Sequence, residues 1–125
     1  KRMAHAIVEG LPFDTCSPSV GGFNRFQAKP DAETVLTVRK IGVSQKGENL
    51  DFAPSFDSDP LLVIGTFGSG RVAAFASDVA PHWVGGLVDW GDSRITVRAE
   101  GSNPREVGNW YAAFFERLIR WVIRE

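Results

Sequence analysis

Residues 61–77 read LLVIGTFGSGRVAAFAS, and this stretch decides the expected fold. Two apolar runs of strand length flank the short loop 68–70 (GSG). Glycine supplies the positive φ that tight hairpin loops require, so the stretch predicts a β-hairpin. Both arms are apolar at successive residues, which indicates strands covered on both faces. This pattern favours a layered α/β fold over a sheet with one face in water.

Residues upstream of this hairpin predict two more strands and a long irregular segment. Residues 23–28 (FNRFQA) and 33–38 (ETVLTV) have strand composition, and the turn sequence KPDA of residues 29–32 separates them. Residues 39–60 are dense in Gly, Pro, Asn and Asp. Such a density of turn formers predicts an irregular excursion that could serve as a mobile flap.

A long helix is predicted over residues 104–124. Asn103 is a suitable N-cap, Pro104 suits the first helical position, and Glu106 can reach back to the cap. At 100° per residue, the large apolar side chains cover one half of the helix surface, so this half is expected to dock on the core. They are Val107, Trp110, Tyr111, Phe114, Phe115, Leu118, Trp121 and Val122.

Length and composition restrict the function classes. The chain has 125 residues, so residues 1–125 are expected to form a single unit. Its 14 basic residues balance 15 acidic ones without a basic stripe, so no nucleic-acid partner is predicted. No apolar run approaches the roughly twenty residues that cross a bilayer, so no membrane partner is predicted. A single cysteine, Cys16, excludes an internal disulfide and fits a cytoplasmic location.

Candidate chemistry concentrates in residues 77–92 (SDVAPHWVGGLVDWGD), directly after the predicted hairpin. Loops at the strand ends of α/β sheets are frequent places for sites. His82 is the catalytic candidate because imidazole titrates near neutral pH, and Asp78 or Asp89 could fix its tautomer. The structural alternative is a packed loop in which the imidazole bonds a backbone carbonyl.

The same segment offers candidates for ligand binding. Trp83 and Trp90, together with Asp89 and the neighbouring glycines, could form a small-molecule pocket or a partner surface. Tryptophans in loops bind sugars and rings well, but they also cap cores. Both interpretations stay open at the level of the sequence.

Three other chemistries receive little support. The glycines of residues 68–70 match no phosphate-binding pattern, and Cys16 lacks the strand and glycines of a nucleophile elbow. The segment therefore holds a candidate base without a nucleophile. No metal or cofactor is predicted, because the spacing of the available ligands fits no defined zinc or calcium site. Those ligands are His5, Asp78, His82, Asp89 and Asp92.

Several segments carry a family resemblance. In this order, residues 7–12 (IVEGLP), 59–63 (DPLLV), 68–78 (GSGRVAAFASD), 81–83 (PHW) and a final helix with Trp-Tyr resemble the glutamine amidotransferase-like family. The resemblance spans nearly the whole chain, and its most specific part runs from Gly70 to Trp83. It implies the flavodoxin-like fold of the class I glutamine amidotransferase-like superfamily, with this chain as the carboxy-terminal part of a larger domain.

The resemblance also implies which catalytic residues of the superfamily have a counterpart in this chain. In working superfamily members the nucleophilic cysteine lies on an elbow in the amino-terminal half, and a His followed two residues on by Glu completes the site. His82 is the position that matches this His, but Val84 stands where Glu is expected. The implied partner is the missing amino-terminal half or another copy of the chain, against which apolar faces of the hairpin and helix would bury.

Two functions follow from these observations. The first is a non-catalytic ligand-binding or assembly module, favoured for this chain alone because both the Glu and the nucleophile are absent. The second is a glutaminase- or amidotransferase-type C–N hydrolase that uses His82 as general base, oriented by Asp78 or Asp89, with a nucleophile outside this chain.

Overall fold

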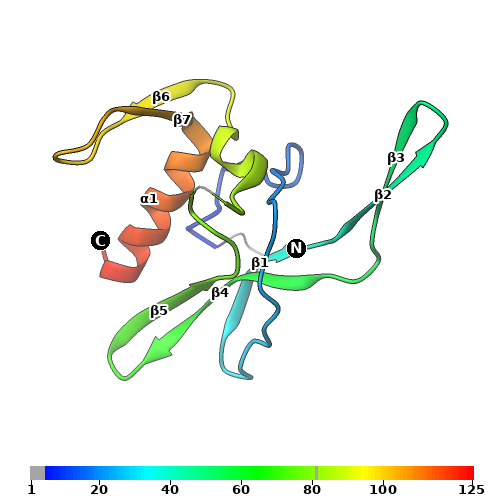
Figure 1. The fold of residues 1–125 in the computed structure, drawn as a ribbon. Coiled ribbons are helices and arrows are strands. Elements are labelled where there is room, and N and C mark those ends of the chain that lie inside the picture. Colours follow the sequence, from blue (N-terminus) through cyan, green and yellow to red (C-terminus); the bar gives the residue numbers. More distant parts are fainter. Residues whose placement is uncertain (1–4, 81) are drawn as a thin grey trace.

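The structure is a computed structural model that describes residues 5–80 and 82–125; Pro81, quoted above in the segment 81–83, lies outside the described residues. Within them, seven strands form three small antiparallel sheets, and one α-helix ends the chain (Figure 1). The mixed α/β class is confirmed. Flavodoxin-like layering is not seen, because every strand pair in the described part of the chain is antiparallel.

The central hairpin is confirmed. Strands β4 (Asp59–Phe67) and β5 (Gly70–Phe75) pair antiparallel, and Gly68 takes a positive φ of 58° in the turn between them. Strand β1 (Glu33–Val38) pairs with the other edge of β4, which gives the order β1-β4-β5. The middle of β4 is buried, but Val72 in β5 is 48% exposed. The prediction that both hairpin strands are covered on both faces is therefore wrong for β5 in this chain.

Two predictions for the upstream half are wrong. Residues 23–28 form no strand, and residues 39–60 contain a second hairpin instead of an irregular excursion. Its strands are β2 (Ile41–Lys46) and β3 (Asn49–Pro54), joined through Gly47 with a φ of 64°. Alternating apolar and polar residues in both strands place their apolar side chains on one face, and this alternation was masked by the surrounding turn formers.

The helix starts later than predicted. Strand β6 (Arg94–Val97) pairs with β7 (Arg105–Gly108), so α1 spans only Asn109–Ile123, and the capping roles predicted for Asn103, Pro104 and Glu106 are wrong. Pairing of Val107 with Ile95 buries Val107 against the body of the protein. This tertiary pairing outweighs a local N-terminal helix signal worth about 1 kcal/mol.

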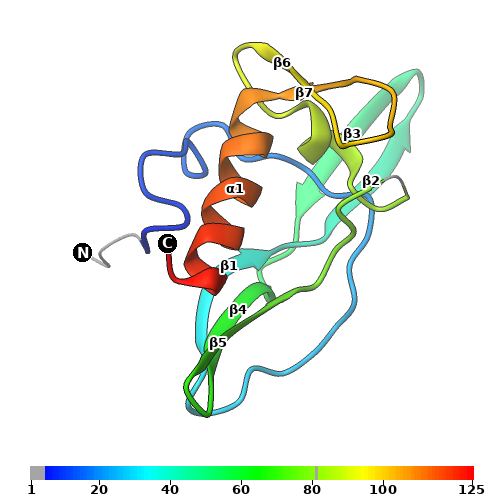
Figure 2. The same cartoon turned by 90° about the vertical axis from the view of Figure 1, so that its left-hand side faces the viewer.

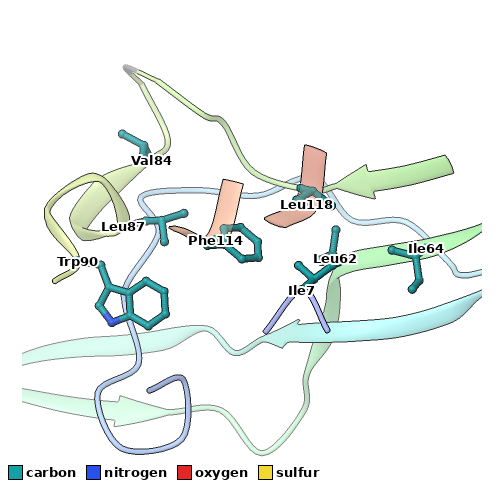
Figure 3. Close-up of a cluster of buried hydrophobic side chains, with 8 residues drawn as sticks. All are labelled: Ile7, Leu62, Ile64, Val84, Leu87, Trp90, Phe114 and Leu118. Carbon is teal, nitrogen blue, oxygen red and sulfur yellow. The ribbon is translucent and has the colours of Figure 1, made fainter. Parts of the chain in front are cut away.

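The core lies between α1 and the β1-β4-β5 sheet. On its other side, α1 faces the amino-terminal segment (Figure 2). There the ring of His5 packs edge-on against Trp121, with ring centroids 5.5 Å apart. Figure 3 shows the buried side chains in a continuous row, with Phe114 of α1 near its middle. The row contains Ile7, Leu62, Ile64, Val84, Leu87, Trp90, Phe114 and Leu118.

Leu87 and Val84 enter this core from the loop that carries the candidate site. Leu87 belongs to a short 3-10 helix, η1 (Gly85–Asp89), and is 3% exposed. Burial of these two side chains fixes the loop at its carboxy-terminal end.

In the described residues, no helix has both the length and the apolar character needed to span a bilayer.

Candidate functional site

The candidate loop leaves the end of β5 and is held against residues 21–24. The N–H of Asn24 donates to the carbonyl of Ala76 at 2.8 Å, and the N–H of Gly21 donates to the carbonyl of Trp83 at 2.8 Å. Between these bonds, the hydroxyl of Ser77 donates to the carbonyl of Gly22 at 2.7 Å. The loop is therefore anchored to a second segment at its start and at Trp83.

Asp78 closes the loop from within. Its Oδ1 accepts the N–H of Ala80 at 3.0 Å, and its Oδ2 accepts the N–H of His82 at 3.2 Å. Partial desolvation raises the pKa of Asp78, but the backbone N–H groups of Ala80, His82 and Trp83 and the nearby imidazole outweigh it, so the pKa lies below its ordinary value of 3.8. Asp78 is thus a carboxylate at neutral pH.

His82 lies beside that carboxylate. Its Nδ1 is 3.7 Å from Oδ2 of Asp78, and its side chain is 82% exposed, against 31% for the side chain of Asp78. At this distance the two groups lie close together without a direct hydrogen bond between their side chains. The imidazole is accessible and lies next to Asp78, and the role of Asp78 in fixing its tautomer stays a prediction.

Trp83 presents a flat apolar surface next to His82. Residue 83 is 42% exposed, and a Cβ added to Gly22 would lie 3.1–3.2 Å from three atoms of the pyrrole ring of its indole. Such close contact with three adjacent ring atoms means that one ring face rests on Gly22. The absence of a side chain at residue 22 is therefore what lets the indole pack there, and the residue is partly exposed.

Tyr111 of α1 contacts the candidate loop. Its hydroxyl donates to the carbonyl of Val79 at 2.8 Å. Burial raises the pKa of Tyr111 above its ordinary value of 10.0, and the negative charge of Asp78 raises it further. The sequence placed Tyr111 only on the docking face of the helix. A phenol on such a face signals a buried partner for its hydroxyl, but the sequence does not say which one.

The structure brings three of the five predicted site residues together. Asp78, His82 and Trp83 line a shallow open hollow with Asn24 and Ser77, and we refer to it as the Trp83 hollow. Sequence reasoning missed the role of residues 21–24, because nothing local links this segment to a loop more than fifty residues away.

Asp89 and Trp90 lie elsewhere. Asp89 is exposed and forms an ion pair with Arg94, whose pKa this pairing raises. Trp90 is 5% exposed, donates from Nε1 to the carbonyl of Cys16 at 2.6 Å, and packs on Phe13 with ring centroids 4.3 Å apart. Trp90 therefore caps the core, the alternative that the sequence left open, and the two residues do not join the Trp83 hollow.

The groups around the Trp83 hollow are suited to binding. They combine an ionised carboxylate, an accessible imidazole, an amide and half of an indole surface. The hydroxyl proton of Ser77 is already donated to a carbonyl, and Cys16 is exposed on a different segment outside the lining. Among residues 5–80 and 82–125, no three His, Cys, Asp or Glu side chains are grouped closely enough to hold a metal ion.

Comparison with models of known protein families gives a match. Residues 1–96 match the model of a protein family described as "Putative glutamine amidotransferase". The match covers the Trp83 hollow and strands β1 to β5, and it ends within β6, before β7 and α1. No curated protein matches the chain. The family resemblance noted in the sequence is confirmed.

Proposed function

The chain belongs to the putative glutamine amidotransferase family, and from this premise we propose that it binds a small molecule at the Trp83 hollow without catalysing a reaction by itself. Membership of a fold family leaves the chemistry to be argued from the site. The observation that carries the proposal is the indole of Trp83, seated on Gly22 beside an accessible imidazole and a carboxylate.

The lining of the hollow selects a ligand class. A flat ring or the apolar face of a sugar would stack on the exposed indole surface of Trp83, a contact worth about 0.5–1.5 kcal/mol beyond area burial. Asp78 would accept hydrogen bonds from hydroxyl or N–H groups at the ligand edge, and His82 would donate or accept. We therefore propose a ring compound or sugar with hydroxyl or N–H groups on one edge.

Intrinsic fluorescence tests this proposal. Titration of the protein with a panel of monosaccharides and nucleosides should give saturable quenching for at least one compound. Calorimetry with that compound should show about tenfold weaker binding for Trp83→Ala, because the stacking surface is lost. A flat response across the panel would count against a ring or sugar ligand.

A glycine pair supplies the matched control. Gly22→Ala should weaken binding, because its Cβ would push the indole away from its present seat at 3.1 Å. Gly42→Ala in β2 should not, because its Cβ would meet nothing closer than 3.6 Å. Equal affinities for the two variants would contradict the role given to the seated indole.

A second function has one observation in its favour, the 3.7 Å approach of His82 Nδ1 to Asp78 Oδ2 at the end of β5. In this alternative, His82 serves as general base of a C–N hydrolase, and a nucleophile outside this chain completes the site. Of the two candidate orienting residues, Asp78 and Asp89, the alternative now uses Asp78, because Asp89 is paired with Arg94. It ranks second because the described lining contains no nucleophile that His82 could activate.

Ammonia release from glutamine by this chain together with the segment that carries the nucleophile tests the hydrolase. His82→Ala should reduce the rate by about 10²-fold or more, the usual contribution of a positioned general base. A rate equal to that of the His82→Ala variant would remove this function and leave the binding proposal unaffected.

A further inference from the structure

The hairpin of β2 and β3, residues 41–54, forms an arm that projects from the rest of the molecule (Figure 1). Within the described residues, its two strands pair with each other and make no extensive contact with another strand or helix. A two-stranded hairpin alone in water is only marginally stable. We therefore expect the arm to pack against a partner surface.

The arm is amphipathic. The register pairs Ile41 with Pro54, Val43 with Phe52 and Gln45 with Leu50, so these side chains share one face. The opposite face is polar and carries the Lys46–Asp51 ion pair at 3.0 Å. The four large apolar residues of the first face are 55–61% exposed: Ile41, Val43, Leu50 and Phe52. One face is thus suited to water and the other to burial.

A cavity of about 840 Å³ opens at the base of the arm, and we call it the base cavity. Ile41 and Pro54, the first register pair of the arm, line its mouth, so the apolar face of the arm continues into it. Its inner wall is made largely of apolar side chains from the sheet, η1 and α1. They include Val35, Leu36, Phe75, Leu87 and Phe114.

We propose that a second copy of this chain covers both surfaces, in a two-fold dimer in which each arm lies along the other and reaches the partner's base cavity. A ribbon with one apolar face is self-complementary about a two-fold axis, as an isologous interface requires. Antiparallel arms place the tip of each beside the base of the other.

The area of the interface favours a second copy over an unrelated chain. A large apolar residue has about 200 Å² of surface, so four such residues that are more than half exposed offer about 400 Å² on one arm. One arm in one foreign groove would bury about 800 Å² in total, the size of a crystal contact. Two arms packed on each other bury about the same 800 Å² in total, and covering both base cavities adds area toward the roughly 1,200 Å² at which stable interfaces begin, which one arm in one foreign groove would not.

Charge supports the same arrangement. Arg39 and Lys40 stand exposed at the base of the arm, and Glu48 stands exposed in the turn at its tip. Lys46 is paired with Asp51 within the arm, which leaves Glu48 to set the net sign of the tip. Antiparallel arms bring Glu48 of one copy toward Arg39 and Lys40 of the other, so dissociation should be promoted by salt.

Sedimentation velocity of the full chain over a range of concentrations tests the proposal. The wild-type chain should sediment as a dimer at micromolar concentration, and Phe52→Ser and Val38→Lys should each shift it to monomer by at least tenfold in dissociation constant. Val38 lines the base cavity, and Phe52 lies at the centre of the apolar face.

Phe67→Ser is the matched control. Phe67 is 85% exposed at the end of β4, away from the arm, so this variant should remain dimeric. Near-ultraviolet circular dichroism on every variant separates loss of the dimer from loss of the fold. A monomeric wild type would overturn the proposal and assign the arm and cavity to another polypeptide. Dimers that survive Phe52→Ser, or that only Phe67→Ser dissolves, would overturn it as well.

Discussion

Asp78 and Tyr111 meet at the candidate loop from different elements. Asp78 accepts hydrogen bonds from the backbone N–H groups of Ala80 and His82 in its own loop. The hydroxyl of Tyr111 in α1 donates to the carbonyl of Val79 in the same loop. The carboxylate and the phenol therefore share a partly desolvated environment in which a second negative charge is unfavourable. Their coupling links the position of the loop to the helix.

The titration of Tyr111 provides a direct measurement of this coupling, because it is the only tyrosine in the chain. Asp78→Asn should lower the pKa of Tyr111 part of the way toward 10.0, and burial, the larger cause, should keep it above that value. Absorbance of the tyrosinate during an alkaline titration reports the shift.

The raised pKa of Tyr111 also determines how the free energy of unfolding changes with pH. Between pH 10.0 and the raised pKa, the folded state keeps a proton that the unfolded state has lost, so the free energy of unfolding falls as pH rises through this window. Asp89→Asn, which removes an exposed carboxylate paired with Arg94, is the control and should leave the Tyr111 titration unchanged. A shift of equal size in both variants would refute a specific coupling with Asp78.

At the scale of elements, the junction of β7 and α1 decides where the helix begins. Gly108 ends β7 and stands at the N-cap, and a Cβ there would overlap the backbone carbonyl of Trp90. The side-chain amide oxygen of Asn109 accepts the N–H of Asp92 at 3.2 Å, which ties the first helical residue to the loop before β6. This close approach fixes the start of the helix at Asn109.

Gly108→Ala should therefore lower the free energy of unfolding by about 1–3 kcal/mol, the usual range for overpacking a fixed backbone contact. Gly108 has a φ of −65°, so the loss would come from steric overlap and not from backbone strain. Urea unfolding followed by circular dichroism measures it. Gly42→Ala, whose Cβ meets only ordinary contacts, should change stability by less than about 0.5 kcal/mol.

At the scale of the whole molecule, the core and the arm differ in whether they need a partner surface. The row of buried side chains around Phe114 is complete within the chain, and truncation of such a phenylalanine costs about 3–5 kcal/mol. The arm, by contrast, leaves its apolar face in water. Folding of the body is thus expected to be independent of a partner, while order in the arm depends on one.

Because the proposed partner is a second copy, thermal stability should depend on protein concentration. The midpoint of unfolding should rise with concentration for the wild-type chain, since association stabilises the folded state by mass action. Phe52→Ser should remove this dependence while retaining a cooperative transition from the body. Differential scanning calorimetry over a hundredfold range measures it, and a wild-type midpoint that stays constant would speak against self-association.

Particular residues show how far the candidate site could be read from the sequence. Asp78, His82 and Trp83 are within six residues of each other, so a single loop brings them together, and their functional roles stay predictions. Trp83 and Trp90 have similar local surroundings, but one is 42% and the other 5% exposed. Their difference comes from what packs on them, Gly22 in one case and Phe13 in the other.

The amino-acid sequence by itself determined the β4–β5 hairpin and the body of α1, because each depends on signals within a short stretch: turn glycines, apolar runs and a helical period. It also determined the family, because the segments that carry the resemblance are read directly along the chain. Only the tertiary structure decided the start of α1 at Asn109, the second hairpin at residues 41–54 and the burial of Trp90. These features depend on partners distant in the chain, and pairing or packing with them outweighs the weaker local preferences of caps and turns.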